Sequence, residues 1–129
     1  MISLDSDCII DFLRGKKEAV DVINKYKDEL VTTEINIFEV FVGIYKNKEI
    51  EEKEGEVAKS FFESLEVLNC GSFGLKSASI FCELINNGKE IEQNDCFVAS
   101  ILLVNNCNKI ITRNTKHFSR IKNLEIISY

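Results

Sequence analysis

The sequence predicts an α/β fold in which a central, mostly parallel sheet of about four or five strands is flanked by helices on both faces. Two observations indicate this class. Short apolar segments of strand character alternate with segments whose apolar residues recur at helical spacing. The segment 109–112 is also too apolar to lie at a surface, which is typical of a parallel strand covered on both faces. Strands separated by one or two helices imply right-handed crossovers and therefore parallel pairing.

The predicted strands are short, and polar residues follow them. The first strand ends at Asp5, and Asp5 or Ser6 begins the next helix, because a short polar side chain caps the free N–H groups of a helix start. The five predicted strand segments are 2–4, 29–33, 66–70, 109–112 and 124–127.

Six further segments carry apolar residues at helical spacing and are predicted to be helices. Asn94 is expected to cap the last of these helices, and Asn87 with Gly88 to end the one before it. The charged run 46–56 has no apolar period, so we interpret it as a solvated helix end or a loop. The six predicted helical segments are 8–13, 16–27, 34–45, 57–65, 75–85 and 95–106.

The composition is that of a single globular domain over residues 1–129, with 45% hydrophobic and 29% charged residues. The sequence has no apolar run of the length of about 18 residues that a membrane span needs, and no signal-peptide pattern, so we expect a cytoplasmic protein. Its five cysteines are an odd number without a CxxC pair. We therefore interpret them as buried thiols rather than as zinc ligands or disulfides.

The charge balance limits how nucleic acid is bound. A net charge of −5 argues against a protein that holds nucleic acid through bulk positive charge, although a local basic rim remains compatible with it. Taken alone, scattered surface charge is the better interpretation of the two small basic clusters that the sequence contains. These clusters are Arg14, Lys16 and Lys17, and Arg113, Lys116, Arg120 and Lys122.

Four polar residues fall where connections cross the carboxyl edge of the predicted sheet, the edge at which open α/β sheets bind ligands. Asp5 follows the first strand, Glu39 lies in the helix after the second, Asp95 opens a helix and Asn114 follows the fourth strand. Carboxylates held close together repel one another unless a cation neutralises them, and Mg²⁺ and Mn²⁺ prefer oxygen ligands. Such an ion activates water and steadies charge on a phosphate, so the predicted chemistry is phosphodiester hydrolysis.

Each acid also has a purely structural interpretation. Asp5 alone is equally well a helix cap, and Glu39 either pairs with Lys46 or is simply exposed. Other site types find little support. The single histidine, His117, excludes a multi-histidine zinc site, and no P-loop or dinucleotide-binding glycine pattern is present. We interpret His117 as a surface loop residue rather than as a base.

Four blocks of the sequence together resemble the signature blocks of PIN-domain ribonucleases, in particular those of the small VapC-type toxins of prokaryotic toxin–antitoxin pairs. The blocks are MISLDSD at 1–7, IFEVFVG at 37–43, DCFVA at 95–99 and ITRNTKHF at 111–118. Each block is unspecific by itself, but all four occur in the right order and spacing over nearly the whole chain. The resemblance implies a PIN-like three-layer fold.

The resemblance also implies which residues form the active site. It makes Asp5, Glu39 and Asp95 the acidic catalytic residues that bind Mg²⁺ or Mn²⁺. Asn114 falls where many members of the family have a fourth aspartate and others have asparagine. This departure removes one negative charge, and it leaves open whether one or two ions bind and whether the site is fully active.

Three further residues are candidate substrate contacts through the same resemblance. Thr112 matches a position that helps to order the site in the family, and Arg113 lies beside it, near the expected path of the substrate backbone. Asp7 stands where an asparagine is common, and it is a candidate either for the outer part of the site or for a helix cap.

The implied activity is Mg²⁺- or Mn²⁺-dependent endonucleolytic cleavage of RNA that leaves a 5′-phosphate and a 3′-hydroxyl. The implied partners are a second copy of the chain and an antitoxin whose tail covers the acidic cleft. We expect the antitoxin on the first helices and the segment 46–62, because of the aromatic residues Phe38, Phe41, Phe61 and Phe62. The alternative is a catalytically inactive PIN fold that binds RNA or a protein.

Overall fold

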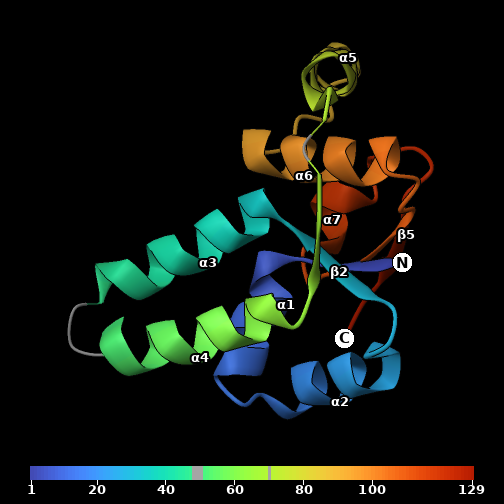
Figure 1. The fold of residues 1–129 in the computed structure, drawn as a ribbon. Helices are drawn as coiled ribbons and strands as arrows, with labels where there is room; N and C mark the ends of the chain where they lie inside the picture. Colours follow the sequence, from blue (N-terminus) through green and yellow to red (C-terminus); the bar gives the residue numbers. More distant parts are fainter. Residues whose placement is uncertain (48–50, 70) are drawn as a thin grey trace.

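Five short strands form one sheet in which each neighbouring pair is parallel (Figure 1). The computed structural model describes residues 1–47, 51–69 and 71–129. The strands lie in the order β3-β2-β1-β4-β5, so the predicted α/β class with a mostly parallel sheet is confirmed. The strands are β1 Ile2–Leu4, β2 Leu30–Thr33, β3 Glu66–Leu68, β4 Lys109–Ile111 and β5 Glu125–Ile127.

Helices cover both faces of this sheet. In Figure 1, α6 lies above the strands with α5 stacked beyond it, whereas α1, α2 and α4 lie below them. Among the helices of the described residues, none is both long and apolar enough to cross a bilayer. The helices are α1 Ser6–Leu13, α2 Lys17–Tyr26, α3 Glu34–Lys46, α4 Glu51–Glu63, α5 Phe73–Asn86, α6 Gln93–Val104 and α7 Thr115–Phe118.

Two hydrophobic cores lie on opposite faces of the sheet. Ile110 packs in the core beneath α5 and α6, whereas the next residue, Ile111, packs in the core shared by α1 and α3. Successive side chains of a strand point to opposite faces, so a central strand needs apolar residues at consecutive positions. This explains the apolar segment from which a buried parallel strand was predicted.

The strand order creates a switch point next to β1. The chain places β2 and β3 on one side of β1 and later returns to place β4 on the other side. The N–H of Asp5, just after β1, donates to the carbonyl of Ile111 at the end of β4, with N and O 3.0 Å apart. In open α/β folds the crevice at such a point is the usual ligand site. The residues that follow β1 and β4 therefore meet at the edge where a site is expected.

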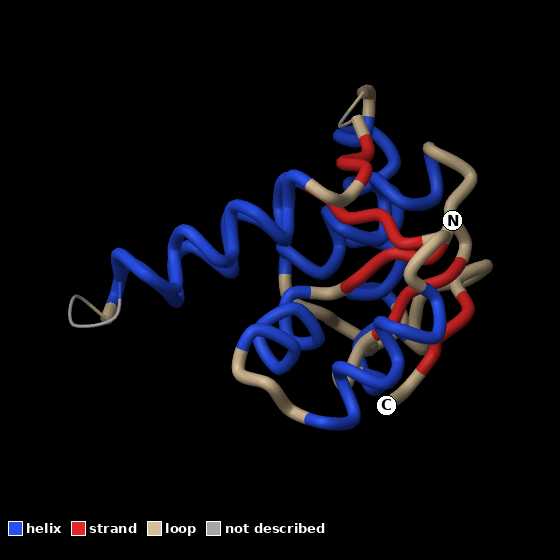
Figure 2. The backbone as a smooth tube through the Cα atoms, turned by 60° about the horizontal axis from the view of Figure 1, so that its bottom comes forward, coloured by secondary structure: helices blue, strands red, loops and turns tan. Residues whose placement is uncertain are grey.

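The charged run 46–56 contributes to two helices. Lys46 ends α3, the predicted loop at 48–50 lies outside the described residues, and α4 begins at Glu51, six residues before the predicted helix start. Ala58 and Phe62 anchor α4 in the core near α1 and α3. The helix begins earlier than predicted because glutamate has a high helix propensity, and its negative charge interacts favourably with the positive N-terminal end of the helix dipole. In Figures 1 and 2 this part of the molecule extends away from the sheet.

The predicted cap of α6 is wrong. Glu92 occupies the N-cap position without a side-chain cap bond, and Asn94 lies inside the helix as its second residue. The Asn94 side chain instead lies near Glu39 and lowers the pKa of that carboxyl. Asn94 thus takes a tertiary partner, which a local capping rule does not consider.

The prediction of buried thiols holds for Cys8, Cys96 and Cys107, but it is wrong for Cys82, which is exposed. Cys82 lies on the solvent-exposed side of α5. Cys70, predicted to end the third strand, lies outside the described residues, and β3 ends at Leu68.

The expected exposed aromatic patch is also largely wrong. Phe38 is 61% exposed, but Phe62 is buried and packs with Phe41 and Phe61, whose rings lie 6.0 Å from it between centroids. Phe61 in turn packs against Phe12 of α1 at 4.7 Å. The aromatic residues of this region therefore join α4 to the rest of the core instead of forming a single docking surface.

Candidate functional site

Asp5 is the centre of the site and is almost fully buried, with 5% of the residue exposed. Its Oδ1 accepts from the Ser6 N–H at 2.9 Å and from Asn36 Nδ2 at 3.2 Å, and its Oδ2 accepts from the Thr112 hydroxyl at 2.7 Å. As the N-cap of α1 it also satisfies a free N–H of that helix start. The two interpretations of Asp5 are therefore compatible, since one residue is both a cap and a member of the site.

The ionised form of Asp5 is disfavoured. Burial, followed by the charges of Asp7 and Asp95, raises the pKa of Asp5 to about 7, against hydrogen bonds from Thr112 and Ser6 that lower it. A low-dielectric position and neighbouring like charges both disfavour a second negative charge. The charge of Asp95 thus acts on Asp5, although the two carboxylates share no hydrogen-bonding partner among the described residues.

Glu39 reaches the site from α3. Its Oε1 accepts from the Ser6 hydroxyl at 2.9 Å, and the same hydroxyl lies 3.5 Å from Asp5 Oδ1, so Ser6 connects the two acids. Burial and the charges of Asp95 and Glu92 raise the pKa of Glu39. Within the described residues Glu39 is therefore bound to Ser6 rather than to Lys46.

Asp95 lies in the first turn of α6 with two nitrogen-bearing neighbours. Its Oδ2 accepts from Asn114 Nδ2 at 3.0 Å and lies 2.8 Å from His117 Nδ1. Burial raises the pKa of Asp95, although the hydrogen bond and charge of His117 oppose this. We refer to Asp5, Glu39 and Asp95 together as the acidic cluster.

The prediction that His117 is a surface loop residue is wrong, because it lies in the short helix α7 and is partly buried. Its side chain is 26% exposed and contacts both Asp95 and Asn114, whose Nδ2 lies 3.1 Å from His117 Nδ1. The spacing of His117 from Asn114 could have indicated this contact. The two residues lie three positions apart at the short helix α7, and residues at this spacing face the same side of a helix.

Asn36 is a second residue of the site that the sequence did not reveal. It is fully buried and donates to Asp5. Thr33 caps α3 by accepting from the Asn36 N–H at 3.3 Å, and its hydroxyl donates to Asn36 Oδ1 at 2.7 Å. A threonine followed three residues later by a polar residue resembles a capping box. The pattern is therefore typical of a helix cap and does not indicate a contact with Asp5.

Two of the candidate substrate residues, Thr112 and Arg113, follow β4, and the third, Asp7, lies in α1. Thr112 donates to Asp5, and Asp7 Oδ2 accepts from the Arg113 N–H at 3.0 Å. Burial raises the pKa of Asp7 against this bond. Asp7 is the second residue of α1 and not its cap, because Asp5 already fills that position. Asp7 thus fixes the loop that carries Arg113.

The donor set suits a hard divalent cation. Three carboxylates with raised pKa values and the amide oxygen of Asn114 are oxygen ligands, which Mg²⁺ and Mn²⁺ prefer, and a cation would relieve their repulsion. In the side-chain arrangement of the described residues, no three His, Cys, Asp or Glu side chains lie close enough to form a ready-made metal site. Ser6, Thr112 and His117 occupy oxygens of the acids instead.

The raised pKa of Asp5 predicts a pH-dependent stability. Between the ordinary pKa of 3.8 and the folded value of about 7, the folded state binds more protons at Asp5 than the unfolded state does. Stability contributed by protonated Asp5 is therefore lost as the pH rises through about 7. Asp5→Asn stays neutral and keeps the helix cap, so its free energy of unfolding should fall less than that of wild type between pH 5 and 8. This difference between the two proteins should change by at most about 1.4 kcal/mol per pH unit. Urea unfolding of both proteins in EDTA measures this, and parallel pH curves would contradict it.

Comparisons with known proteins agree with the fold. The sequence model described as the PIN domain matches residues 2–124. No curated protein matches the chain. Among solved structures, a chain of VapBC2 from Rickettsia felis, bound to a promoter DNA fragment, is similar with a TM-score of 0.88 and 22% identity. That similarity covers 100% of this chain and 99% of the other.

Two further structures show the same likeness. A chain of VapBC-1 from nontypeable Haemophilus influenzae is 24% identical over 99% of this chain and 98% of its own, with a TM-score of 0.83. A chain of DNA-bound VapBC from Salmonella typhimurium is 22% identical over the same shares, with a TM-score of 0.82. At these identities the structures establish a shared fold. Because the family match spans almost the whole chain, the protein belongs to the PIN domain family.

Proposed function

We propose that the chain is a metal-dependent endoribonuclease and the toxin of a VapBC-type toxin–antitoxin pair. The observation that carries this proposal is the acidic cluster at the switch point of a PIN domain: Ser6 links Asp5 to Glu39, Asp95 contacts Asn114 and His117, and all three acids have raised pKa values. The structures of similar fold are VapBC complexes, which supports the assignment as a toxin.

In this proposal Asp5, Glu39, Asp95 and Asn114 hold Mg²⁺ or Mn²⁺. The bound ion supplies an activated water and neutralises charge that develops on the phosphate. The other residues organise these ligands. Thr112 orients Asp5 through its hydroxyl, and His117 orients Asp95. Both contacts restrict the acids to a few orientations, and this lowers the cost of bringing them to a common ion.

The RNA substrate lies along the loop after β4 in this proposal. Arg113 is 50% exposed and Lys116 is also exposed, so both side chains are accessible to phosphates of the RNA backbone. Contacts to phosphates position a nucleic acid without reading its sequence. Cleavage on this path leaves a 5′-phosphate and a 3′-hydroxyl.

An inactive PIN fold that binds RNA or protein is the second candidate. Two observations favour it: Asn114 carries no charge, and the acids of the described residues are bridged by neutral groups. A protein without catalysis has no need of an ion, so metal binding distinguishes the two functions.

We expect the purified protein to cleave single-stranded and structured RNAs with Mg²⁺ or Mn²⁺ and to lose this activity in EDTA. Asp95→Asn keeps the shape of the side chain but removes a charged ligand, so the rate should fall by at least about a hundredfold. Asp21→Asn is the matched control, because Asp21 is an exposed residue of α2. Gel analysis of time courses measures the three proteins side by side. Equal cleavage by all three, or cleavage that persists in EDTA, contradicts the proposal.

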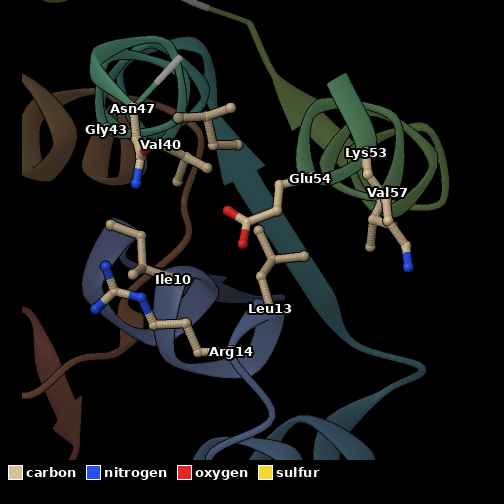
Figure 3. Close-up of a pocket in the computed structure, with 10 residues that line it drawn as sticks. Ile10, Leu13, Arg14, Val40, Gly43, Asn47, Lys53, Glu54 and Val57 are labelled. Atoms are coloured by element: carbon tan, nitrogen blue, oxygen red, sulfur yellow. The ribbon is translucent and has the colours of Figure 1, made fainter. Parts of the chain in front are cut away.

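The antitoxin is proposed to bind a groove between α1, α3 and α4 (Figure 3). The groove has a volume of about 420 Å³, and apolar side chains of Ile10, Leu13, Val40 and Val57 line it. The charged residues Arg14, Lys53 and Glu54 also line the groove, and the Glu54 carboxylate points into its middle. A groove that combines apolar and charged side chains suits an amphipathic segment of a partner protein. The similar VapBC structures favour an antitoxin as this partner.

We expect a small DNA-binding protein to be encoded immediately upstream and to copurify with the chain. Val57→Asp places a charge in the groove at a half-exposed position, so it should weaken this complex by at least about tenfold without unfolding the chain. Val104→Asp, at a similarly exposed position of α6, is the matched control. Pull-down with the coexpressed upstream protein measures both variants, and equal retention by both would refute the groove as the antitoxin site.

A second copy of the chain is proposed to bind the outer face of α5. Leu75, Ala78, Cys82 and Ile85 are all exposed, with Leu75 at 85%, and their spacing forms one stripe along the helix. Alternating steps of three and four residues are the pattern by which two helices pair. Two copies can therefore bury the same stripe against each other across a twofold axis.

Leu75→Arg should convert the proposed dimer into a monomer, because it places a charge at the most exposed position of the stripe. Light scattering after size-exclusion chromatography measures the mass of each protein. Val57→Arg, outside α5, controls for the added charge and should leave the dimer intact. A monomeric wild-type protein would overturn this assembly.

A further inference from the structure

Asp11 is a buried carboxylate that lies outside the acidic cluster. Only 2% of its side chain is exposed, and groups from three separate segments surround it. Lys16 Nζ lies 2.8 Å from Oδ1, Arg113 Nε lies 3.0 Å from Oδ2, and the Tyr129 hydroxyl donates to Oδ2 at 2.9 Å. A buried carboxylate is costly unless opposite charges and hydrogen bonds compensate its lost hydration. These partners therefore keep Asp11 charged and confined to one position.

The electrostatics of Asp11 agree with this arrangement. Burial acts to raise the pKa of Asp11, but Lys16, Tyr129 and Arg113 together outweigh that effect, so the pKa is lowered overall. Asp11 is thus opposite in character to Asp5, Glu39 and Asp95, whose pKa values are raised. An acid that is already neutralised by its neighbours has no need of a metal ion.

Arg113 is the member of this group that faces solvent. Its side chain is 50% exposed, and its ion pair with Asp11 uses Nε. Among the described residues, the two terminal nitrogens of its guanidinium donate no hydrogen bond. A guanidinium carries five N–H donors in a rigid fork that matches the oxygens of a phosphate. One edge of this fork is therefore held by Asp11 while the other is available to an anion.

The loop places this guanidinium next to the acidic cluster. Thr112, one residue before Arg113, donates to Asp5 at 2.7 Å, and Asn114, one residue after it, donates to Asp95 at 3.0 Å. Asp7 and Asp11 lie four residues apart on one face of α1. Asp7 accepts from the backbone of Arg113, and Asp11 holds its side chain. The position and the direction of Arg113 are thus set by the same helix.

We propose that Asp11 is a positioning residue that aims Arg113 at a phosphate of the RNA backbone beside the cleaved bond. This inference rests on the proposed ribonuclease function. Asp11 does not touch the substrate and acts only through Arg113. Fixing an arginine before the substrate arrives reduces the conformational entropy lost on binding, and so strengthens the contact.

If Asp11 acted only through its negative charge on the RNA, Asp11→Asn would have the opposite effect on RNA binding from the one that positioning predicts. Replacing Asp11 by asparagine removes a negative charge near the RNA, and this alone should strengthen RNA binding. Positioning predicts weaker binding, because Arg113 loses the partner that holds it. The sign of the change in Kd therefore separates the two explanations.

The experiment is a double-mutant cycle with Asp11→Asn and Arg113→Ala. The probe is a fluorescently labelled single-stranded RNA of mixed sequence, with binding measured in EDTA and cleavage measured with Mn²⁺. Arg113→Ala and Asp11→Asn should each raise Kd and KM by about tenfold, while kcat stays within about twofold. In the Arg113→Ala background, Asp11→Asn should have no further effect on Kd, because the residue it acts through is absent.

Two variants separate positioning from stability. Tyr129→Phe removes one hydrogen bond from Asp11 without altering a charge, so it should lower Tm but leave Kd within about twofold of wild type. Arg113→Lys keeps the charge but lacks the fork, so it should bind RNA several times more weakly than wild type, on the order of threefold or more. This variant also tests the proposal if Asp11→Asn does not fold, because Arg113 is half-exposed and its replacement leaves the core intact.

The outcomes distinguish this inference from the proposed function. If Asp11→Asn leaves Kd unchanged or lowers it, or acts equally strongly without Arg113, positioning is wrong even where wild type cleaves RNA. Wild-type binding by Arg113→Lys overturns it as well. If no RNA is cleaved with any metal but the cycle shows the expected coupling in Kd, the nuclease assignment fails and the positioning of Arg113 stands.

Discussion

The repulsion among carboxylates buried at one edge of the sheet is the constraint on which the rest of the site depends. Asp5 lies where β1 meets β4, and its pKa of about 7 reflects burial together with the charges of Asp7 and Asp95. Such a cluster persists only if other interactions hold the acids in place. Hydroxyls and amides from three segments do this, through Ser6, Asn36 and Thr112. The frame of neutral donors is therefore as much a part of the site as the acids are.

Two kinds of acid lie within this small region, and α1 carries members of both. Asp5 caps the helix and faces the cluster, where burial, followed by the charges of Asp7 and Asp95, raises its pKa. Asp11, further along the same helix, lies among Lys16, Tyr129 and Arg113, which together outweigh burial and lower its pKa. Both residues are almost fully buried, so burial acts against the charged form of each, and Asp11 alone of the two has cationic partners that reverse the direction of the shift. One helix thus presents an acid with a raised pKa to the site and an acid with a lowered pKa to the loop beside it.

The surfaces proposed for partners lie apart from the acidic cluster. The groove between α1, α3 and α4 contains no residue of the cluster, and the stripe on α5 lies on the far side of α6 (Figure 1). Burying either surface therefore leaves the acids and their hydrogen bonds in place. An antitoxin that occupies the groove would need a further segment to reach the acidic cluster, consistent with a tail that extends from a helical anchor.

The amino-acid sequence by itself determined the alternation of strands and helices and the parallel sheet, and it led to the prediction that Asp5, Glu39, Asp95 and Asn114 gather at one edge. These features follow from periodicity and from the rule that parallel strands end at a common edge. Only the tertiary structure decided the parts that depend on which side chains face one another. His117 proved to contact Asp95, Asn94 took Glu39 as partner instead of capping α6, and Phe62 turned into the core. The buried ion pair of Asp11 with Arg113 joins residues about a hundred positions apart, and a local sequence pattern carries no information about contacts over such a separation.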